Sequence, residues 1–400
     1  MRALFTTQPS FGHWHPLVPL AQAWEAAGHE VAFASTPGFC SIIEAKGFRC
    51  FRAGSDDRPE ERRQRGAQMA GMNDQEQISF TLSTVFAGVR AVRSLPDLQN
   101  IIRDWRADVV VRENTEFAGC VAAERAGIAH AAVQIMAAWP FFLQAVEAPL
   151  AYLRASVGLT SEKPADVLYR HLLLSPRPPR LWTPSVPVPP TTHPFRYAGF
   201  NQSGAEGLPP WVARLEKRPT VYATLGTFEN SMTEILAAIL EGLREEPINL
   251  ILTVGRNRDP LEFGEQLAHV HVERYIPQSL LLPYCDLVIC HGGSGTMMDA
   301  LSLGLPMVIM PVAADQPENA QRCREAGVAR VIEPDQRTGQ GLSQAIRDAT
   351  REVLENPAYR QNAQRLRKEI EELPGLDHAV ALLERLAVER APLIAQPAMN

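Results

Sequence analysis

Cysteine is scarce in this sequence, and no cysteines are spaced to hold a metal. The 400 residues contain six cysteines, none of them in a C-x-x-C pattern. We therefore expect neither a disulfide framework nor a zinc site, and we expect a reducing, cytoplasmic setting. The cysteines are scattered along the chain, at Cys40, Cys50, Cys120, Cys285, Cys290 and Cys323.

Long hydrophobic runs and an excess of positive charge are also missing. No apolar run reaches the ~18–20 residues that a membrane-spanning helix needs, and the segment 1–14, with one charge, does not read as a signal peptide. Lysine and arginine number 39 against 45 acidic residues, for a net charge of −6. We therefore expect no integral membrane association and no nucleic-acid partner. An anionic ligand would need a local arrangement of donors.

The chain is long enough for two domains, and both halves alternate strands with helices. This alternation predicts an α/β fold in which parallel sheets carry helices on both faces. Strands are expected at 2–6, 30–35, 48–52, 109–111, 130–135, 220–225, 250–254, 270–274, 287–290 and 307–310.

Changes in amino-acid composition along the chain suggest where the predicted domains begin and end. The stretch 175–194 is rich in proline and should be extended, because each proline fixes φ and removes a donor. With a linker near 200–210, the predicted domains are 1–205 and 206–375, followed by an amphipathic tail, 376–400. The charged run 55–65 is interpreted as a solvated loop or helix face, where a metal role for Asp56 and Asp57 is not expected.

A glycine-rich turn, His291–Thr296 (HGGSGT), lies between a predicted strand and a predicted helix. Glycines let backbone N–H groups approach an anion, and a helix N-terminus adds partial positive charge. The turn is neither G-x-G-x-x-G nor a Walker A motif, which disfavours a dinucleotide or ATP site. Taken alone, it could equally be a tight structural turn.

The surrounding residues make the turn more specific. Tyr275-Ile276-Pro277-Gln278 precedes it, and Asp299, Gly304-Leu305-Pro306 and Asp315-Gln316-Pro317-Glu318-Asn319 follow it. This run, 275–320, resembles the donor-binding signature of the family 1 glycosyltransferases. GHWHP at 12–16 and TLGT at 224–227 match two further motifs of that family, so the likeness covers the full length. Bacterial macrolide and natural-product glycosyltransferases are the most similar members.

The resemblance implies a GT-B fold, in which two facing Rossmann-like domains enclose a cleft. It also implies that the tail packs back on the N-terminal, acceptor-binding domain. The C-terminal domain would bind a UDP- or TDP-sugar as a co-substrate, with no cofactor and no metal. A monomer or a homodimer would be compatible with this reading.

The resemblance implies a donor-binding role for each residue that matches a motif position of the family. Tyr275 would stack on the base, and the Ile276 backbone would bind its edge; Gln278 and Asp299 would contact the ribose. Further matched positions surround the diphosphate and the sugar. Those for the pyrophosphate are His291, Gly293, Ser294, Gly295, Thr296, Gly226 and Thr227, and those for the sugar hydroxyls are Asp315 and Gln316.

The acceptor hydroxyl must lose a proton as it attacks the anomeric carbon, and an imidazole suits that step. His13 matches the catalytic histidine of the family, and Glu113 the acid that orients it, although plant members have Asp there. Direct displacement would invert the anomeric configuration. His15 is a weaker candidate that could assist His13 or simply pack.

Aromatic and methionine residues of the first half suggest a pocket for a lipophilic acceptor. The candidates are Trp14, Met72, Phe80, Met136, Trp139 and Phe142. The expected reaction is transfer of glucose or a similar hexose to a hydroxyl of a hydrophobic natural product. Two alternatives stay open: a UDP-sugar 2-epimerase on the same fold, and a non-catalytic auxiliary protein of a glycosyltransferase.

Overall fold

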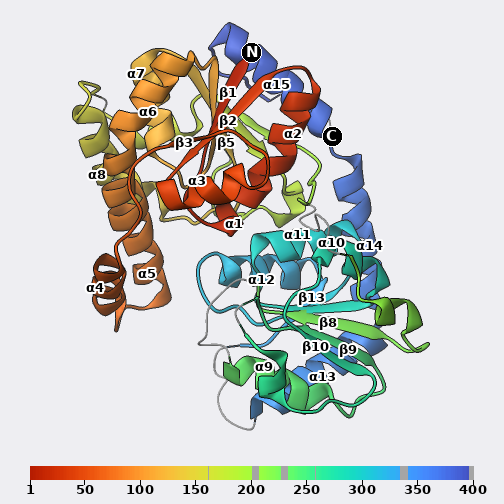
Figure 1. Cartoon of the computed structure of the whole chain (residues 1–400). Helices are drawn as coiled ribbons and strands as arrows, with labels where there is room; N and C mark the ends of the chain where they lie inside the picture. Colours follow the sequence, from red (N-terminus) through yellow and green to blue (C-terminus); the bar gives the residue numbers. More distant parts are fainter. Residues whose placement is uncertain (161, 201–206, 227–232, 257, 334–340, 396–400) are drawn as a thin grey trace. The chain divides into compact units, whose positions relative to one another are not determined.

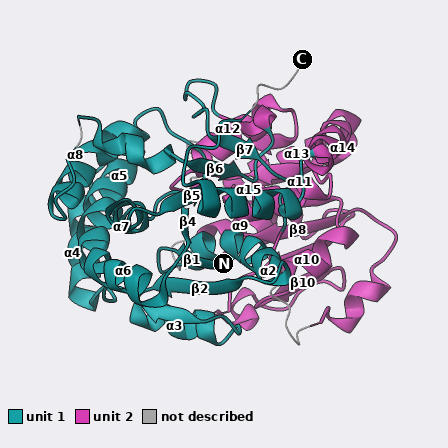
Figure 2. Ribbon diagram, turned by 90° about the horizontal axis from the view of Figure 1, so that it is seen from above, with its two compact units in different colours: residues 1–178, 183–198, 373–400 teal, residues 179–182, 199–372 magenta. Residues whose placement is uncertain are grey.

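The computed structural model describes residues 1–160, 162–200, 207–226, 233–256, 258–333 and 341–395. The chain forms two compact units, shown in different colours in Figure 2. Unit 1 comprises Met1–Pro178, Thr183–Ala198 and Leu373–Asn400, and unit 2 comprises Pro179–Trp182 and Gly199–Glu372. The chain therefore leaves unit 1 after Ala198 and returns to it at Leu373.

Unit 1 is built on a seven-stranded sheet in the order β3-β2-β1-β4-β5-β6-β7, with every neighbouring pair parallel. The central strands are almost continuously apolar, as strands covered on both faces must be. The strands are β1 (Arg2–Thr6), β2 (Glu30–Ser35), β3 (Cys50–Arg52), β4 (Val109–Glu113), β5 (Ala129–Val133), β6 (Leu172–Ser175) and β7 (Thr192–Pro194).

Helices cover this sheet on both faces (Figure 1). On one face, the core joins β1 and β4 to α6, α7 and α8. The last helix, α15 (Leu376–Glu389), lies beside α2 and packs on β4 and β5. The helices of unit 1 that precede it are α1 (Phe11–Trp14), α2 (Val18–Ala26), α3 (Pro37–Glu44), α4 (Pro59–Met69), α5 (Asp74–Phe80), the π-helix η2 (Thr81–Arg90), α6 (Ala91–Trp105), α7 (Ala118–Ala126) and α8 (Phe142–Ala155).

Unit 2 repeats the architecture with a six-stranded parallel sheet in the order β10-β9-β8-β11-β12-β13. A core on one face joins the sheet to α9 (Thr233–Leu243) and α13 (Gly341–Glu355). The strands are β8 (Thr220–Thr224), β9 (Asn249–Thr253), β10 (Val270–Glu273), β11 (Leu287–Cys290), β12 (Met307–Ile309) and β13 (Ala329–Val331), and the other helices include α11 (Ser294–Ser302), α12 (Gln316–Glu325) and α14 (Pro357–Glu372).

The predicted α/β class, with two Rossmann-like parallel sheets, is confirmed. The two units divide at 198/199 and 372/373, a few residues before the expected boundaries, and residues 179–182 group with unit 2. In the described part of the chain, no helix is both long and apolar enough to cross a bilayer.

One expectation about unit 1 is wrong, and a second holds only in part. Cys40 and Cys50 form a disulfide, because α3 runs back to β3 and brings their Cα atoms to 5.4 Å; a spacing of ten residues gave no signal of it. The run 55–65 is not wholly solvated either. Arg58 and Arg63 are exposed, but the carboxylate of Asp57 is only 7% exposed and is held by arginines.

Candidate active site

In unit 1, His13 and Glu113 meet at the carboxyl ends of two neighbouring strands. His13 lies in the short helix after β1, and Glu113 is the last residue of β4, which pairs with β1. Their side chains form a 2.9 Å contact between His13 Nδ1 and Glu113 Oε1. Because a carboxylate can only accept, Nδ1 carries the proton. In the neutral ring, Nε2 is then the nitrogen that can take a proton from another molecule.

The surroundings of Glu113 keep it ionised. Burial opposes its charge, but His13 and the hydroxyl and N–H of Thr115 outweigh burial and hold the pKa of Glu113 below its usual value. Thr115 donates to Glu113 Oε2 through its backbone N–H at 2.5 Å and its hydroxyl at 2.7 Å. Its hydroxyl also lies 3.2 Å from His13 Nδ1. Sequence reasoning missed Thr115, whose only signal was its position just beyond a strand end.

The pKa of a second carboxylate nearby is shifted in the opposite direction. Glu116 is fully buried, and burial raises its pKa despite hydrogen bonds from Thr6 and from the N-terminal N–H groups of α7. Glu113 adds to this rise, because two like charges so close together are unfavourable. The environment therefore shifts the pKa values of the two acids in opposite directions, and the one that pairs with the imidazole, Glu113, has the lowered pKa.

The acceptor-pocket candidates differ in how exposed their side chains are. Trp14 is fully buried against Phe33 and Phe39, so the structure makes it a core residue and closed to a ligand. Trp139 and Phe142 stack on each other and are 8% and 5% exposed. Met72, Phe80 and Met136 are partly exposed, so their proposed contact with an acceptor stays a prediction.

His15 has the surroundings of a packed residue. Its ring lies against Phe11 and Trp14. Burial, assisted by the charge of Lys46, lowers the pKa of His15 to about 4. His15 is thus neutral near pH 7.

In unit 2, glycines make room for His291 at the end of β11. A Cβ at Gly293 would lie 2.5 Å from His291 Nε2, and one at Gly226 would lie 2.8 Å from Cε1. The imidazole is 8% exposed, and its Nδ1 has no hydrogen-bond partner among the described residues. Burial, partly offset by Asp315, lowers the pKa of His291 to about 4. It can thus offer a neutral N–H to a ligand.

The polar side chains around α11 hold one another in two groups. In the first, Ser294 Oγ donates to Asp315 Oδ2 at 2.8 Å, and Asn319 Nδ2 donates to the same oxygen at 2.9 Å and to the Gly292 carbonyl at 2.8 Å. In the second, Gln278 Nε2 donates to Asp299 Oδ2 at 2.8 Å, and the Thr296 hydroxyl reaches Gln278 Oε1 at 3.4 Å. The two predicted ribose residues, Gln278 and Asp299, are therefore neighbours. Asn319 is a further residue of this site that was not assigned a role.

Other predicted donor residues have contacts of their own. Gln316 Oε1 accepts from the N–H groups of Val312 and Ala313 at 2.7 and 3.0 Å, and the residue is 3% exposed. The guanidinium of Arg256 lies 3.7 Å from the centroid of the Tyr275 ring, the predicted stacking surface. Ile276 is buried and Gly295 lies in the first turn of α11. Thr227 lies outside the described residues.

Over the described ranges, no three His, Cys, Asp or Glu residues come together in a way that could hold an ion. The polar groups available at both strand ends are therefore a histidine–carboxylate pair in unit 1 and an N–H-rich turn in unit 2. Such groups can move a proton and bind an anion, respectively.

Family models match most of the chain. Residues 22–226 match "Erythromycin biosynthesis protein CIII-like, N-terminal domain", and residues 248–386 match the corresponding C-terminal domain. Among similar proteins, the 10-deoxymethynolide desosaminyltransferase of Streptomyces venezuelae is 30% identical over 97% of this chain and 98% of its own. The 4'-demethylrebeccamycin synthase of Lentzea aerocolonigenes is 30% identical over 96% of this chain and 99% of its own.

Solved structures agree over the full length. The glycosyltransferase SnogD from Streptomyces nogalater superimposes with a TM-score of 0.80 at 27% identity, covering 97% of this chain and 99% of its own. The glycosyltransferase VinC in complex with dTDP has a TM-score of 0.78 at 25% identity, covering 97% of this chain and 100% of its own.

Proposed function

The chain belongs to the erythromycin biosynthesis protein CIII-like family of nucleotide-sugar-dependent natural-product glycosyltransferases, and from this premise we propose that it transfers a deoxysugar from a TDP-sugar to a hydroxyl of a lipophilic acceptor. The geometry that carries the proposal is the 2.9 Å contact between His13 and the buried, ionised Glu113. TDP is favoured over UDP because VinC, a similar protein, has a crystal structure in complex with dTDP.

The proposed chemistry follows from the two strand-end sites. His13 Nε2 removes the proton from the acceptor hydroxyl, and Glu113 stabilises the imidazolium that forms. The hydroxyl oxygen attacks the anomeric carbon as the bond to the diphosphate breaks, so the configuration inverts. The negative charge on the leaving diphosphate is met by the N-terminal N–H groups of α11 and by the neutral N–H of His291.

The predicted preference for a glucose-like sugar rested on Asp315 and Gln316 as partners of free sugar hydroxyls, and those roles stay predictions. Asp315 Oδ2 accepts from Ser294 and Asn319, and Gln316 Oε1 accepts from two backbone N–H groups. The names of similar proteins favour a different sugar. A similar protein from Streptomyces galilaeus is named a 2-deoxy-L-fucose transferase, at 28% identity. We therefore propose a deoxygenated sugar.

The test begins with nucleotide binding. Thermal unfolding is followed with TDP, UDP and GDP, and TDP at about 100 times its dissociation constant should stabilise the protein by about 2.7 kcal/mol. TDP-2-deoxy-L-fucose and TDP-glucose are then offered with a set of polyketide aglycones, and products are identified by mass spectrometry. We expect transfer from the deoxysugar donor and inversion at the anomeric carbon by NMR.

The alternatives give distinct outcomes in the same experiment. An epimerase would isomerise the nucleotide sugar without any acceptor, and an auxiliary protein would form no product when purified alone. Stabilisation by GDP only, or transfer from TDP-glucose only, would contradict the proposed donor. Retention of the anomeric configuration would contradict the role of His13 as a base for direct displacement.

A further inference from the structure

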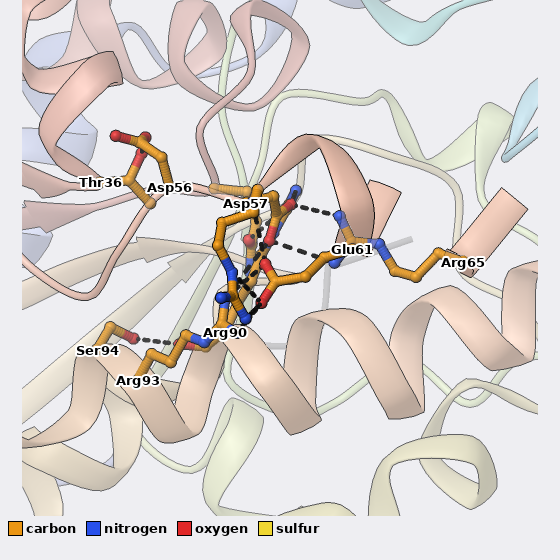
Figure 3. A network of polar contacts seen from close by, with 10 residues as sticks. Thr36, Asp56, Asp57, Glu61, Arg65, Arg90, Arg93 and Ser94 are labelled. Carbon is orange, nitrogen blue, oxygen red and sulfur yellow. Dashed lines mark hydrogen bonds and ion pairs between the residues drawn. The ribbon is translucent and has the colours of Figure 1, made fainter. Parts of the chain in front are cut away.

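A partly buried ion-pair cluster lies in unit 1 (Figure 3). Its centre is the carboxylate of Asp57, which is 7% exposed. Arg65 contacts both oxygens of this carboxylate at 3.2 and 2.7 Å, and Arg90 Nη2 donates to Oδ2 at 2.6 Å. Burial opposes the charge, but the two arginines outweigh it and hold the pKa of Asp57 below its usual value.

The cluster joins the segment 57–65 to the segment 90–93, which lies about thirty residues further along the chain. Asp57 is in the loop after β3, Arg65 is in α4, Arg90 ends the π-helix η2, and Arg93 is in α6. A second carboxylate, Glu61, accepts from Arg93 at 2.8 Å. Arg90 and Arg93 are thus three residues apart and each binds an acid of the same cluster.

From the cluster, Arg90 continues toward His13 by hydrogen bonds. Its Nη1 donates to Gln8 Oε1 at 3.2 Å, and Gln8 Nε2 donates to the Thr115 carbonyl at 3.1 Å. The Thr115 hydroxyl then lies 2.7 Å from Glu113 Oε2 and 3.2 Å from His13 Nδ1. Gln8 is 4% exposed and Thr115 is fully buried, so the middle of this path is buried.

A second contact route from Arg90 reaches the same imidazole. The guanidinium of Arg90 lies 5.4 Å from the centroid of the Phe86 ring, within cation–π range. The Phe86 ring meets His13 edge-on, with centroids 5.5 Å apart and an angle of 82°. Phe86 and Arg90 both belong to η2, so the position of this π-helix sets where Phe86 meets His13.

We propose that Arg90, held in place by Asp57, is a positioning residue that fixes the orientation of the His13 imidazole through Gln8–Thr115 and through Phe86. The proposal rests on the proposed role of His13 as the base. Arginine suits it because its fork of donors can bind Asp57 with one nitrogen and Gln8 with the other. Arg93 contacts the cluster but neither Gln8 nor Phe86, which makes it the matched control.

The experiment compares R90A with R93A in the full-length protein by NMR. The imidazole N–H proton that His13 shares with Glu113 is observed with 15N-labelled histidine and assigned by its loss in H13Q. Both variants should melt at a lower temperature, since each removes one guanidinium from the cluster. R93A should retain the His13 Nδ1 proton, whereas R90A should exchange it with water about tenfold faster or lose it.

Activity supplies a second readout. With TDP-2-deoxy-L-fucose and an aglycone that the wild-type enzyme uses, kcat of R90A should fall about 10-fold or more relative to R93A. The affinity of both variants for TDP should be that of wild type. If R90A does not fold, R90K and Q8M replace it: each interrupts the path between Asp57 and Thr115 and should alter the same NMR signal.

Equal behaviour of R90A and R93A in the NMR experiment would overturn the proposal and leave the cluster a stabilising element only. Absence of the His13 signal in the wild-type protein would overturn it as well. The proposed function fails separately, if the wild-type enzyme binds TDP but transfers no sugar. The NMR comparison needs neither donor nor acceptor, so the two failures are distinguishable.

Discussion

At the scale of single residues, the chemistry depends on how His13 and His291 are held. The two imidazoles have opposite surroundings. His13 shares a proton with an ionised carboxylate and is 15% exposed, which suits a group that must accept and return a proton. His291 is enclosed by glycines and buried, with its pKa lowered to about 4, which suits a group that only donates a hydrogen bond.

The first prediction concerns the His13–Glu113 pair. H13A and E113Q should each lower kcat by about 10²–10⁴-fold, because the first removes the base and the second no longer fixes its tautomer. TDP affinity, measured by calorimetry, should not change, since the predicted donor residues belong to unit 2. Full transfer activity in H13A would show that another group takes the proton.

The second prediction concerns the space around His291. In G293A the new methyl group would lie 2.5 Å from His291 Nε2, so the ring must move. We expect TDP affinity to fall by about 10-fold, equivalent to about 1.4 kcal/mol. G207A is the control, because a methyl group there meets no atom within 4 Å. Equal TDP affinity in the two variants would argue against a donor role for His291.

At the scale of secondary-structure elements, close packing and charge pairing decide stability. Gly242 in α9 approaches α13 so closely that a Cβ would lie 2.5 Å from the Ser343 carbonyl oxygen. This oxygen belongs to a helix backbone and cannot move aside by a rotamer change. Gly66 in α4 is the opposite case, since its Cβ would meet nothing within 4 Å.

The third prediction uses these two glycines as a pair. G242A should destabilise the protein by about 1–3 kcal/mol through overpacking. G66A should stabilise it by about 0.5–1 kcal/mol, because alanine is the better helix former. Urea unfolding measures both. A neutral G242A would mean that α9 and α13 can separate at little cost.

The fourth prediction concerns pH and the Asp57 cluster. Because the folded-state pKa of Asp57 is below its usual value, its ion pairs stabilise the fold fully above the unfolded-state pKa of about 4. This stabilisation is lost as the pH falls through the folded-state pKa. D57N should therefore be about 1–3 kcal/mol less stable than wild type at pH 7. The difference should shrink as the pH falls below the unfolded-state pKa of about 4; a constant difference at all pH values would contradict the ionic origin.

Sequence reasoning succeeded where a pattern is local. The strand 287–290 and the turn after it were predicted closely, because an apolar run followed by glycines is visible within ten residues. It failed where contacts between residues far apart in the sequence determine the burial of a side chain or the pairing of cysteines. The run 55–65 looks solvated, and nothing near Asp57 in the sequence shows that Arg90 would bury it. The disulfide between Cys40 and Cys50 was not predicted for the same reason, since it depends on where α3 ends relative to β3.

In the candidate site, too, residues marked by a local pattern were predicted and residues placed by long-range contacts were not. His13 and Glu113 were found because each follows a strand and matches a family motif, and the parallel pairing of β1 with β4 brings them together. Thr115, Asn319 and Arg256 were not assigned roles, because their contacts come from side-chain directions that no spacing reveals. Trp14 was misjudged, since an aromatic next to a catalytic histidine can equally face the core.

At the scale of the whole molecule, unit 1 is completed by residues from the far end of the chain. Helix α15 buries Leu382, Leu383 and Leu386 against the rest of unit 1. Each buried leucine contributes about 1.5–3 kcal/mol. Their sum is comparable to the whole free energy of unfolding of a typical domain.

The fifth prediction tests this dependence. L386A should destabilise unit 1 by about 2–5 kcal/mol, because it opens a cavity beneath α15. V388A, two residues away at a side chain that is 69% exposed, should change stability by less than about 0.5 kcal/mol. Limited proteolysis should then cut L386A within unit 1 before unit 2. Cleavage that begins in unit 2 would contradict the assignment of α15 to unit 1.

The return of the chain to unit 1 also fixes an order of events during translation. Residues 199–372 form nearly all of unit 2 without interruption, so this unit can fold as soon as it leaves the ribosome. Unit 1 must wait for α15, which is synthesised after all of unit 2. At ribosomal rates, the surface that α15 will cover stays bare for roughly 10–40 s. During this interval we expect the nascent first half of this enzyme to be a target for chaperones.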